Sequence, residues 1–232
     1  MKLVLLPGMD GTGNLFQPFI NEVPSDIDCT VISYPNNECL SYKELEAYVL
    51  DKLPKEEDFV LLAESFSGPI GYLLAKRNLA NMKGVIFVAT FLQSPKKLLV
   101  NLGELLPLSL LLALPIPKFI IKQFFLGKNA NNYIITLFKK TLKNISSEVL
   151  SFRIKEISKL CLNLEKIRIK SYYIQALNDK LVSSNNLASF TTISDILKTI
   201  KINGPHFILQ AKPKECAEFI TNEIRLITSQ ST

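Results

Sequence analysis

One serine of the chain has surroundings that favour nucleophilic chemistry. It lies in the segment FVLLAESFSG, residues 59–68, where an apolar run typical of a buried strand ends just before Ser65. Pro69 follows shortly after, and proline suits the first turn of a helix. Ala63 and Ser67 stand two positions to either side, and a sharp strand-to-helix turn needs such small residues there because bulky ones would collide with the backbone. The pattern therefore makes Ser65 a candidate nucleophile.

Two other interpretations of this segment stay open. Ser67 is a rival nucleophile, although it would have Pro69 at plus two and would lie inside the turn, so the spacing favours Ser65. Ser65 could also act only as a helix cap. The pattern small-x-Ser-x-small is less specific than G-x-S-x-G, because Ala63 and Ser67 stand where glycines are usual.

An acid and a histidine follow later strand-like runs. Asp179 comes after the run Ser171–Ala176, and His206, the one histidine of the chain, comes after Leu197–Ile202. Taken singly, the aspartate is more commonly a turn residue and the histidine a structural one. The order serine, acid, histidine is nevertheless that of one class of catalytic triads, and all three would meet at the same edge of a parallel sheet. Asp195 is the nearest alternative acid in sequence.

A glycine-rich loop, LPGMDGTG, follows the first apolar run at residues 6–13. The spacing of its glycines matches neither the phosphate-binding nor the dinucleotide-binding pattern. Such a loop can instead bring a backbone N–H close to an oxyanion. For Asp10, within the loop, a turn-forming role is favoured over a catalytic one.

Apolar runs alternate along the chain with segments of helical period, which is typical of a parallel sheet covered by helices on both faces. The predicted strands are Lys2–Leu6, Cys29–Ser33, Phe59–Ala63, Val85–Ala89, Ser171–Ala176 and Leu197–Ile202. The predicted helices are Lys43–Leu53, Pro69–Leu79 and Glu215–Thr228. The sequence thus predicts an α/β fold.

Residues 92–168 interrupt this alternation and are predicted to form a helical lid between two parts of one core, residues 1–91 and 169–232. The segment carries 13 Lys and Arg against 4 Asp and Glu, a net charge of +9, so the rest of the chain sums to −3. Its apolar stretches, Leu105–Leu114 and Phe119–Phe125, could line an acyl-chain pocket or form only the packing face of the lid. The positive charge would suit an acidic carrier protein or an anionic membrane surface, or it reflects a lysine-rich insertion with no partner.

Composition excludes several other classes of protein. The chain has 232 residues, of which 47% are hydrophobic, so one domain with a sizeable core is expected. Its four cysteines lie far apart and it has a single histidine, so neither a metal site nor a disulfide framework is expected. The net charge is +6, but the sequence contains no nucleic-acid recognition motif, so a nucleic-acid-binding protein is not expected. With no signal peptide or spanning segment predicted, a cytoplasmic location is expected.

These motifs together resemble the α/β-hydrolase family, in particular its small bacterial carboxylesterases, over essentially the whole chain. The matching pieces are LLPGMDGTG, AESFSG, LNDKLV and GPHFILQAKPKECAEFI. There is some similarity to esterases that cleave a pimeloyl-carrier-protein methyl ester, and the PG-x-DGTG loop also occurs in plant enzymes that esterify phytol. The sequence departs from the family in two ways: Pro7 replaces a usual histidine, and Lys2–Leu6 already leads into the glycine loop, without the family's first two strands.

The resemblance implies an α/β-hydrolase fold and a catalytic triad of Ser65, His206 and Asp179. It places the backbone N–H groups of Met9 and Phe66 in an oxyanion hole, and it implies no metal or organic cofactor. The implied activity is hydrolysis of a carboxylic ester through an acyl-enzyme. Acyl transfer, a lipase or thioesterase activity on a lipid chain, and a non-catalytic binding protein with this fold are the alternatives.

Overall fold

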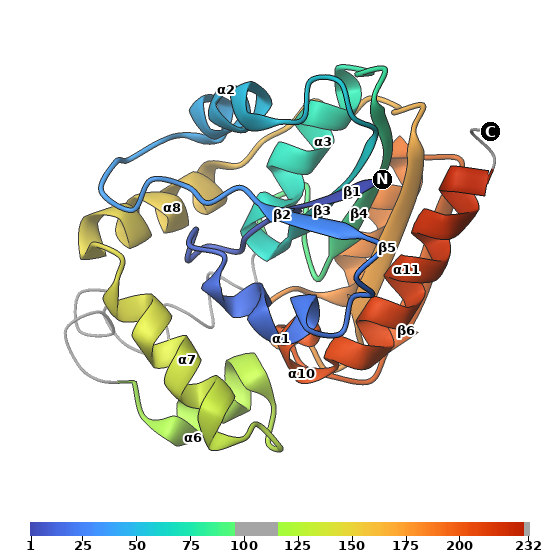
Figure 1. The fold of residues 1–232 in the computed structure, drawn as a ribbon. Coiled ribbons are helices and arrows are strands. Elements are labelled where there is room, and N and C mark those ends of the chain that lie inside the picture. Colours follow the sequence, from blue (N-terminus) through green and yellow to red (C-terminus); the bar gives the residue numbers. More distant parts are fainter. Residues whose placement is uncertain (96–115, 230–232) are drawn as a thin grey trace.

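The computed structural model describes residues 1–95 and 116–229, so the predicted pocket segment Leu105–Leu114 lies outside the described residues. In the described part, six parallel strands form one sheet in the order β2-β1-β3-β4-β5-β6 (Figure 1). Their bounds are β1 Lys2–Leu6, β2 Asp28–Val31, β3 Phe59–Glu64, β4 Met82–Val88, β5 Lys170–Ala176 and β6 Leu197–Ile202. The parallel sheet predicted from the apolar runs is confirmed.

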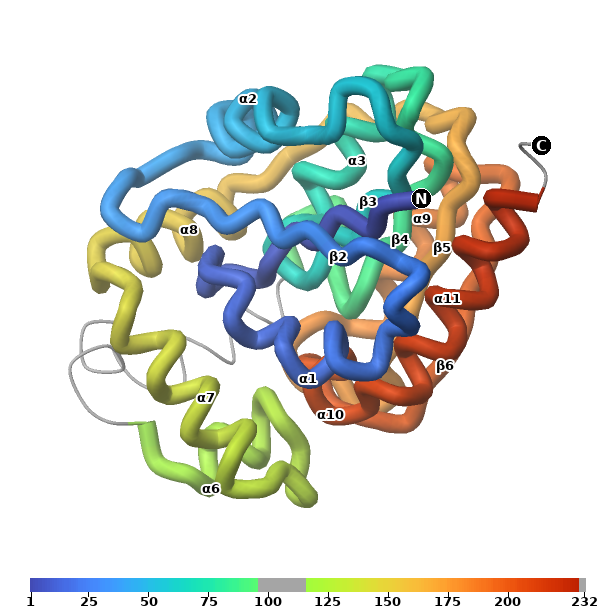
Figure 2. The backbone as a smooth tube through the Cα atoms, in the orientation of Figure 1, coloured from blue at the N-terminus to red at the C-terminus, as the bar shows by residue number. Residues whose placement is uncertain are grey.

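The two faces of the sheet are covered by different helices. Helices α2 (Tyr42–Lys52) and α3 (Gly68–Lys76) lie next to each other along one face (Figure 2). With α9 (Leu187–Ile193) they share a core with alternate residues of the central strands. On the other face α1 (Gln17–Ile20), α10 (Ile208–Ala211) and α11 (Pro213–Ser229) form a second core. Because both faces are covered, β3 is buried at every position, which explains its uninterrupted apolar run.

Helices also occupy the described part of the segment between β4 and β5. They are α6 (Lys118–Ile120), which continues as a π-helix over Ile121–Leu126, then α7 (Asn132–Lys143) and α8 (Ser147–Lys159). In Figure 1, α6 and α7 stand away from the sheet, whereas α8 leads back toward α2. The stretch Phe119–Phe125 was predicted to line an acyl-chain pocket or to form a packing face. Within it, Ile121 and Phe125 are buried in the core cluster, whereas Phe119 is 71% exposed.

Several predicted boundaries were wrong by a few residues. Strand β4 begins at Met82, three residues before the predicted Val85. Helix α3 ends at Lys76 because Asn78 adopts a left-handed conformation with φ 50°, which terminates a helix before the predicted Leu79. None of the helices in the ranges 1–95 and 116–229 is both long and apolar enough to cross a membrane.

Candidate active site

Ser65 lies on the sharp turn between β3 and α3. Its φ of 49° is in the left-handed region, which a non-glycine residue rarely adopts and which marks strain at functional sites. The turn is tied to the neighbouring strand, because Thr90, just after β4, donates its hydroxyl to the Ser65 carbonyl, and Tyr173 Oη donates to Thr90 O at 2.9 Å. A side chain at Gly68 would collide with Thr90. Close packing around the turn thus requires a glycine at position 68.

The structure brings Ser65, His206 and Asp179 together at the carboxyl edge of the sheet. Ser65 Oγ lies 2.8 Å from His206 Nε2, and His206 Nδ1 lies 2.7 Å from Asp179 Oδ2. The other carboxylate oxygen, Asp179 Oδ1, accepts hydrogen bonds of 2.8 Å from the backbone N–H groups of Leu181 and Val182. The Asp179 carboxylate therefore has fixed partners on both oxygens and holds the orientation of the imidazole.

The competing residues from the sequence lie in other environments. Ser67 is fully buried, is hydrogen bonded to the Tyr34 hydroxyl and donates to the Pro7 carbonyl. Asp195 forms an exposed ion pair with Lys166 at 2.5 Å. Neither residue is hydrogen bonded to His206, whose two ring nitrogens face Ser65 and Asp179.

Two opposing effects act on the pKa of His206, which is buried. Burial lowers this pKa because it disfavours the charged imidazolium. The Asp179 carboxylate raises it through its charge and its hydrogen bond, and Glu64 raises it further. The net pKa of His206 lies above the usual value for histidine, as suits a base that must hold a proton during a reaction.

The glycine loop after β1 passes directly beside the serine. A Cβ placed on Gly8 would lie 3.8 Å from the Ser65 Cβ, so the peptide that joins Gly8 to Met9 is next to Ser65. Within the loop, Asp10 Oδ2 accepts hydrogen bonds from the Thr12 N–H at 3.0 Å and from its hydroxyl at 2.7 Å, so Asp10 forms a local turn. The backbone of Met9 thus approaches Ser65 from one side, and Phe66 follows Ser65 in the chain.

Sequence reasoning missed a second buried carboxyl group, Glu64, immediately before Ser65. Burial raises the pKa of Glu64 to about 7, although Gln210 Nε2 donates a hydrogen bond of 3.0 Å that acts in the opposite direction. The sequence did contain one signal for this group, because Glu64 is a charged residue at the end of an otherwise apolar run. Its partner Gln210 comes from α10, 146 residues further along the chain, so no local pattern could have identified the pair.

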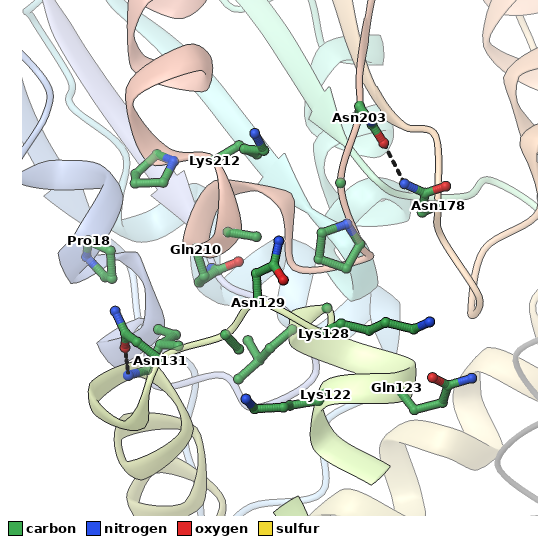
Figure 3. A pocket seen from close by; sticks show the side chains of 18 of the residues that line it. Pro18, Lys122, Gln123, Lys128, Asn129, Asn131, Asn178, Asn203, Gln210 and Lys212 are labelled. Atoms are coloured by element: carbon green, nitrogen blue, oxygen red, sulfur yellow. Dashed lines mark hydrogen bonds between the residues drawn. The ribbon is translucent and has the colours of Figure 1, made fainter. Parts of the chain in front are cut away.

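A cavity of about 760 Å³ lies beside the loop that precedes His206 (Figure 3). The loop contributes residues 203–205 to its wall, and the segment around α6 and α7 contributes much of the remainder. No Asp or Glu is among the described residues that line it, while four lysines are: Lys122, Lys128, Lys180 and Lys212. Lys212 is ion-paired to Glu215 at 2.9 Å. The cavity therefore has a positively charged lining close to the candidate active site.

The described residues contain no group of three or more His, Cys, Asp or Glu side chains arranged to hold a metal ion. The cysteines Cys29, Cys39, Cys161 and Cys216 are unpaired thiols.

No family model matches the sequence, and no curated protein matches it. Solved structures match over nearly the whole chain. An esterase from Exiguobacterium antarcticum is similar with a TM-score of 0.76 at 14% identity, over 97% of this chain and 92% of that one. A lipase-esterase related protein from Clostridium acetobutylicum has a TM-score of 0.73 at 16% identity, over 95% and 93%. The chain has the α/β-hydrolase fold.

A thioesterase of this α/β-hydrolase fold, RedJ from the prodiginine biosynthetic pathway of Streptomyces coelicolor, is also similar. Its TM-score is 0.71 at 14% identity, and the match covers 96% of this chain and 85% of that one. The α/β-hydrolase fold expected from the resemblance is confirmed. In the described part of the chain all six strands of the sheet are parallel.

Proposed function

We propose that this protein is a serine hydrolase that cleaves carboxylic esters, with Ser65, His206 and Asp179 as its catalytic triad. The observation that carries the proposal is the continuous hydrogen-bonded chain from Ser65 Oγ through His206 to Asp179, with spacings of 2.8 Å and 2.7 Å. A serine with a left-handed backbone at a strand-to-helix turn supports the same role for Ser65.

The reaction has two halves. In the first, neutral His206 accepts the Ser65 hydroxyl proton at Nε2 while Oγ attacks the ester carbonyl, and His206 then gives that proton to the leaving alcohol. In the second, His206 takes a proton from water, which attacks the acyl-enzyme, and returns it to Ser65 Oγ as the acid is released. Asp179 stabilises the imidazolium formed in each half without becoming protonated.

Backbone N–H groups of Met9 and Phe66 are proposed to stabilise the negative oxygen of each tetrahedral intermediate. Phe66 is bonded directly to Ser65, and the loop that contains Met9 is adjacent through Gly8. Both groups belong to the backbone, so replacement by any residue other than proline leaves them in place. Their contribution depends instead on how firmly the loop and the turn are held.

For the substrate, we propose an acyl group carried on an acidic partner, such as an acyl carrier protein. The net charge of +9 over residues 92–168 supports this, as does the lysine-lined cavity beside the His206 loop (Figure 3). The similarity to the RedJ thioesterase is consistent with a carrier-bound acyl group. A pimeloyl-type methyl ester is one substrate of this class. An anionic lipid surface is the alternative target of the same charge.

The proposal is tested with acyl esters of graded chain length, assayed with the wild type, Ser65→Ala and Ser158→Ala. Ser158 is exposed on α8, so its substitution controls for loss of a serine hydroxyl. Ester hydrolysis by the wild type and a loss of about 10⁶-fold in kcat for Ser65→Ala alone would support the proposal. Ester hydrolysis that survives Ser65→Ala, or a folded wild type with no activity on any ester, would refute it.

A further inference from the structure

Arg153, near the middle of α8, is buried against the loop that contains Met9. Its side chain is 2% exposed. It is the largest by volume of the fully buried side chains in the described part of the chain. Nη1 donates a hydrogen bond of 2.9 Å to the Met9 carbonyl, and Nη2 donates one of 2.8 Å to the Pro35 carbonyl. The rigid fork of an arginine thus joins the loop after β1 to the loop after β2.

The same guanidinium lies against two aromatic rings. Its Cζ is 5.7 Å from the ring centroid of Tyr34 and 5.9 Å from that of Phe66, within the range of cation–π attraction. The Phe66 ring is also stacked on Tyr42, with centroids 4.8 Å apart. Arg153 therefore contacts both residues proposed to form the oxyanion hole, Met9 through its carbonyl and Phe66 through its ring.

The glycine loop is shaped around this arginine. Gly11 has a φ of +71°, and a side chain there would collide with the Arg153 guanidinium. The Met9 side chain packs against the apolar cluster formed by Ile145, Val149 and Leu150 at the start of α8. Helix α8 thus holds Met9 at two points, its carbonyl oxygen and its side chain.

We propose that Arg153 is a positioning residue that fixes the oxyanion hole from the segment inserted between β4 and β5. The Met9 carbonyl and the Met9 N–H belong to the peptide groups on either side of one Cα. Holding the carbonyl therefore restricts the rotation that would turn the N–H away from Ser65. The inference rests on the proposed ester hydrolysis, because that reaction places a negative oxygen at Met9 and Phe66.

The charge of Arg153 adds a second effect. An arginine remains protonated in proteins, and the hydrogen bonds of Arg153 are to neutral carbonyl oxygens, although the buried carboxylate of Asp10 also interacts with its charge. A buried positive charge beside a site where negative charge develops stabilises the transition state more than the neutral substrate. Substitution of Arg153 should therefore lower kcat rather than weaken substrate binding.

The test compares Arg153→Met and Arg153→Lys with Arg77→Met. Arg77 is at the far end of α3 from Ser65 and pairs with Glu46 at 2.7 Å, so its substitution removes one positive charge away from the loop. We expect kcat to fall about 10²-fold in Arg153→Met with KM little changed, the loss typical of an active-site group displaced by about 1 Å. Arg153→Lys, which keeps the charge but lacks the fork, should show a smaller loss, and Arg77→Met should behave like the wild type.

Two inhibitors separate positioning from a purely structural role. An alkyl trifluoromethyl ketone forms a tetrahedral adduct on Ser65, whereas the matching methyl ketone serves as a ground-state analogue. The affinity of the fluorinated ketone should weaken in parallel with kcat/KM in the Arg153 variants, while that of the methyl ketone should not change. These measurements are made well below the melting temperature of each variant.

Equal weakening of both ketones, or wild-type kcat in a folded Arg153→Lys and Arg153→Met, would overturn the role of Arg153. Failure of both variants to fold would also overturn it, since the residue would then be needed for folding itself. A wild type that neither hydrolyses esters nor binds the fluorinated ketone would instead reject the proposed function. The two failures are therefore distinguishable.

Discussion

His206 and Asp179 are joined at 2.7 Å through Nδ1 and Oδ2, and the second oxygen of Asp179 accepts the backbone N–H groups of Leu181 and Val182. An ionised carboxylate only accepts hydrogen bonds, so Nδ1 must carry the proton. The lone pair of neutral His206 is then on Nε2, which faces Ser65 Oγ at 2.8 Å. Asp179 thereby selects the tautomer that can act as a base.

Replacing Asp179 by Asn should abolish most activity while preserving the fold. The amide oxygen can still accept the Leu181 and Val182 N–H groups, but the amide nitrogen would donate to Nδ1 and favour the wrong tautomer. We expect kcat for ester hydrolysis to fall about 10⁴-fold with a nearly unchanged melting temperature.

Asp195→Asn is the matched control, because Asp195 is exposed and paired only with Lys166 in the described structure. Its kcat should equal that of the wild type. Normal activity in Asp179→Asn together with a loss in Asp195→Asn would mean that the acid had been assigned to the wrong residue.

The activity should rise with pH as His206 loses its proton. Burial lowers the pKa of His206, but Asp179 and then Glu64 raise it more, so the midpoint of the kcat/KM profile should lie above the usual histidine value. Glu64→Gln removes one of the charges that raise this pKa and should move the midpoint to lower pH. A midpoint in Glu64→Gln that is higher than in the wild type would contradict this electrostatic account.

Sequence reasoning worked best where the signal was local. The apolar run Leu197–Ile202 gave the bounds of β6 without error, because a strand between turn residues is marked at both ends. The small residues around Ser65 likewise indicated a tight turn, and the structure shows the left-handed φ of 49° that such a turn needs. Asp179 and His206 each follow a predicted strand. Because the carboxyl ends of parallel strands meet at one edge of the sheet, their positions in the sequence already indicated that they would lie close together.

What could not be predicted depends on contacts between distant segments. Arg153 resembles any other basic residue of α8 in sequence, and its carbonyl partners lie 144 and 118 residues away. The bond between Glu64 and Gln210 likewise joins a strand to a helix near the other end of the chain.

Glu64 should make stability depend on pH. In the folded protein burial raises its pKa to about 7, above its ordinary value of 4.5, so between these values the folded state binds more protons than the unfolded chain. The free energy of unfolding should therefore fall as pH rises through this window, by roughly 3 kcal/mol at most. Glu64→Gln should lose this contribution, which denaturant titrations of both proteins at pH 4.5 and pH 7.5 would measure. A stability difference between the two proteins that does not change with pH would exclude a buried, titrating Glu64.

The positive charge of residues 92–168 should act on association with an anionic substrate. Exposed charges are screened over about 8–10 Å at physiological ionic strength and affect mainly the rate of encounter. Charge reversal of Lys140 and Lys143, both exposed on α7, should lower kcat/KM for an acyl-carrier-protein substrate about tenfold at low salt. A small neutral ester should be hydrolysed at the wild-type rate.

Lys52→Glu and Lys55→Glu provide the matched charge reversal, since these exposed lysines precede β3 at the opposite edge of the sheet. The carrier-bound substrate should show a steep salt dependence with the wild type and with this control. The same salt dependence for the neutral ester would argue against recruitment by charge, because it would indicate a general effect on the enzyme.

The most direct test of Ser65 as the nucleophile is to locate the residue that a covalent inhibitor modifies. The wild type is treated with a fluorophosphonate, digested, and its modified peptide sequenced by mass spectrometry, with Ser65→Ala and Ser67→Ala treated in parallel. A single modification is expected on Ser65 in the wild type and in Ser67→Ala, and none in Ser65→Ala. A modification on Ser67, or labelling that persists in Ser65→Ala, would show that Ser65 is not the nucleophile.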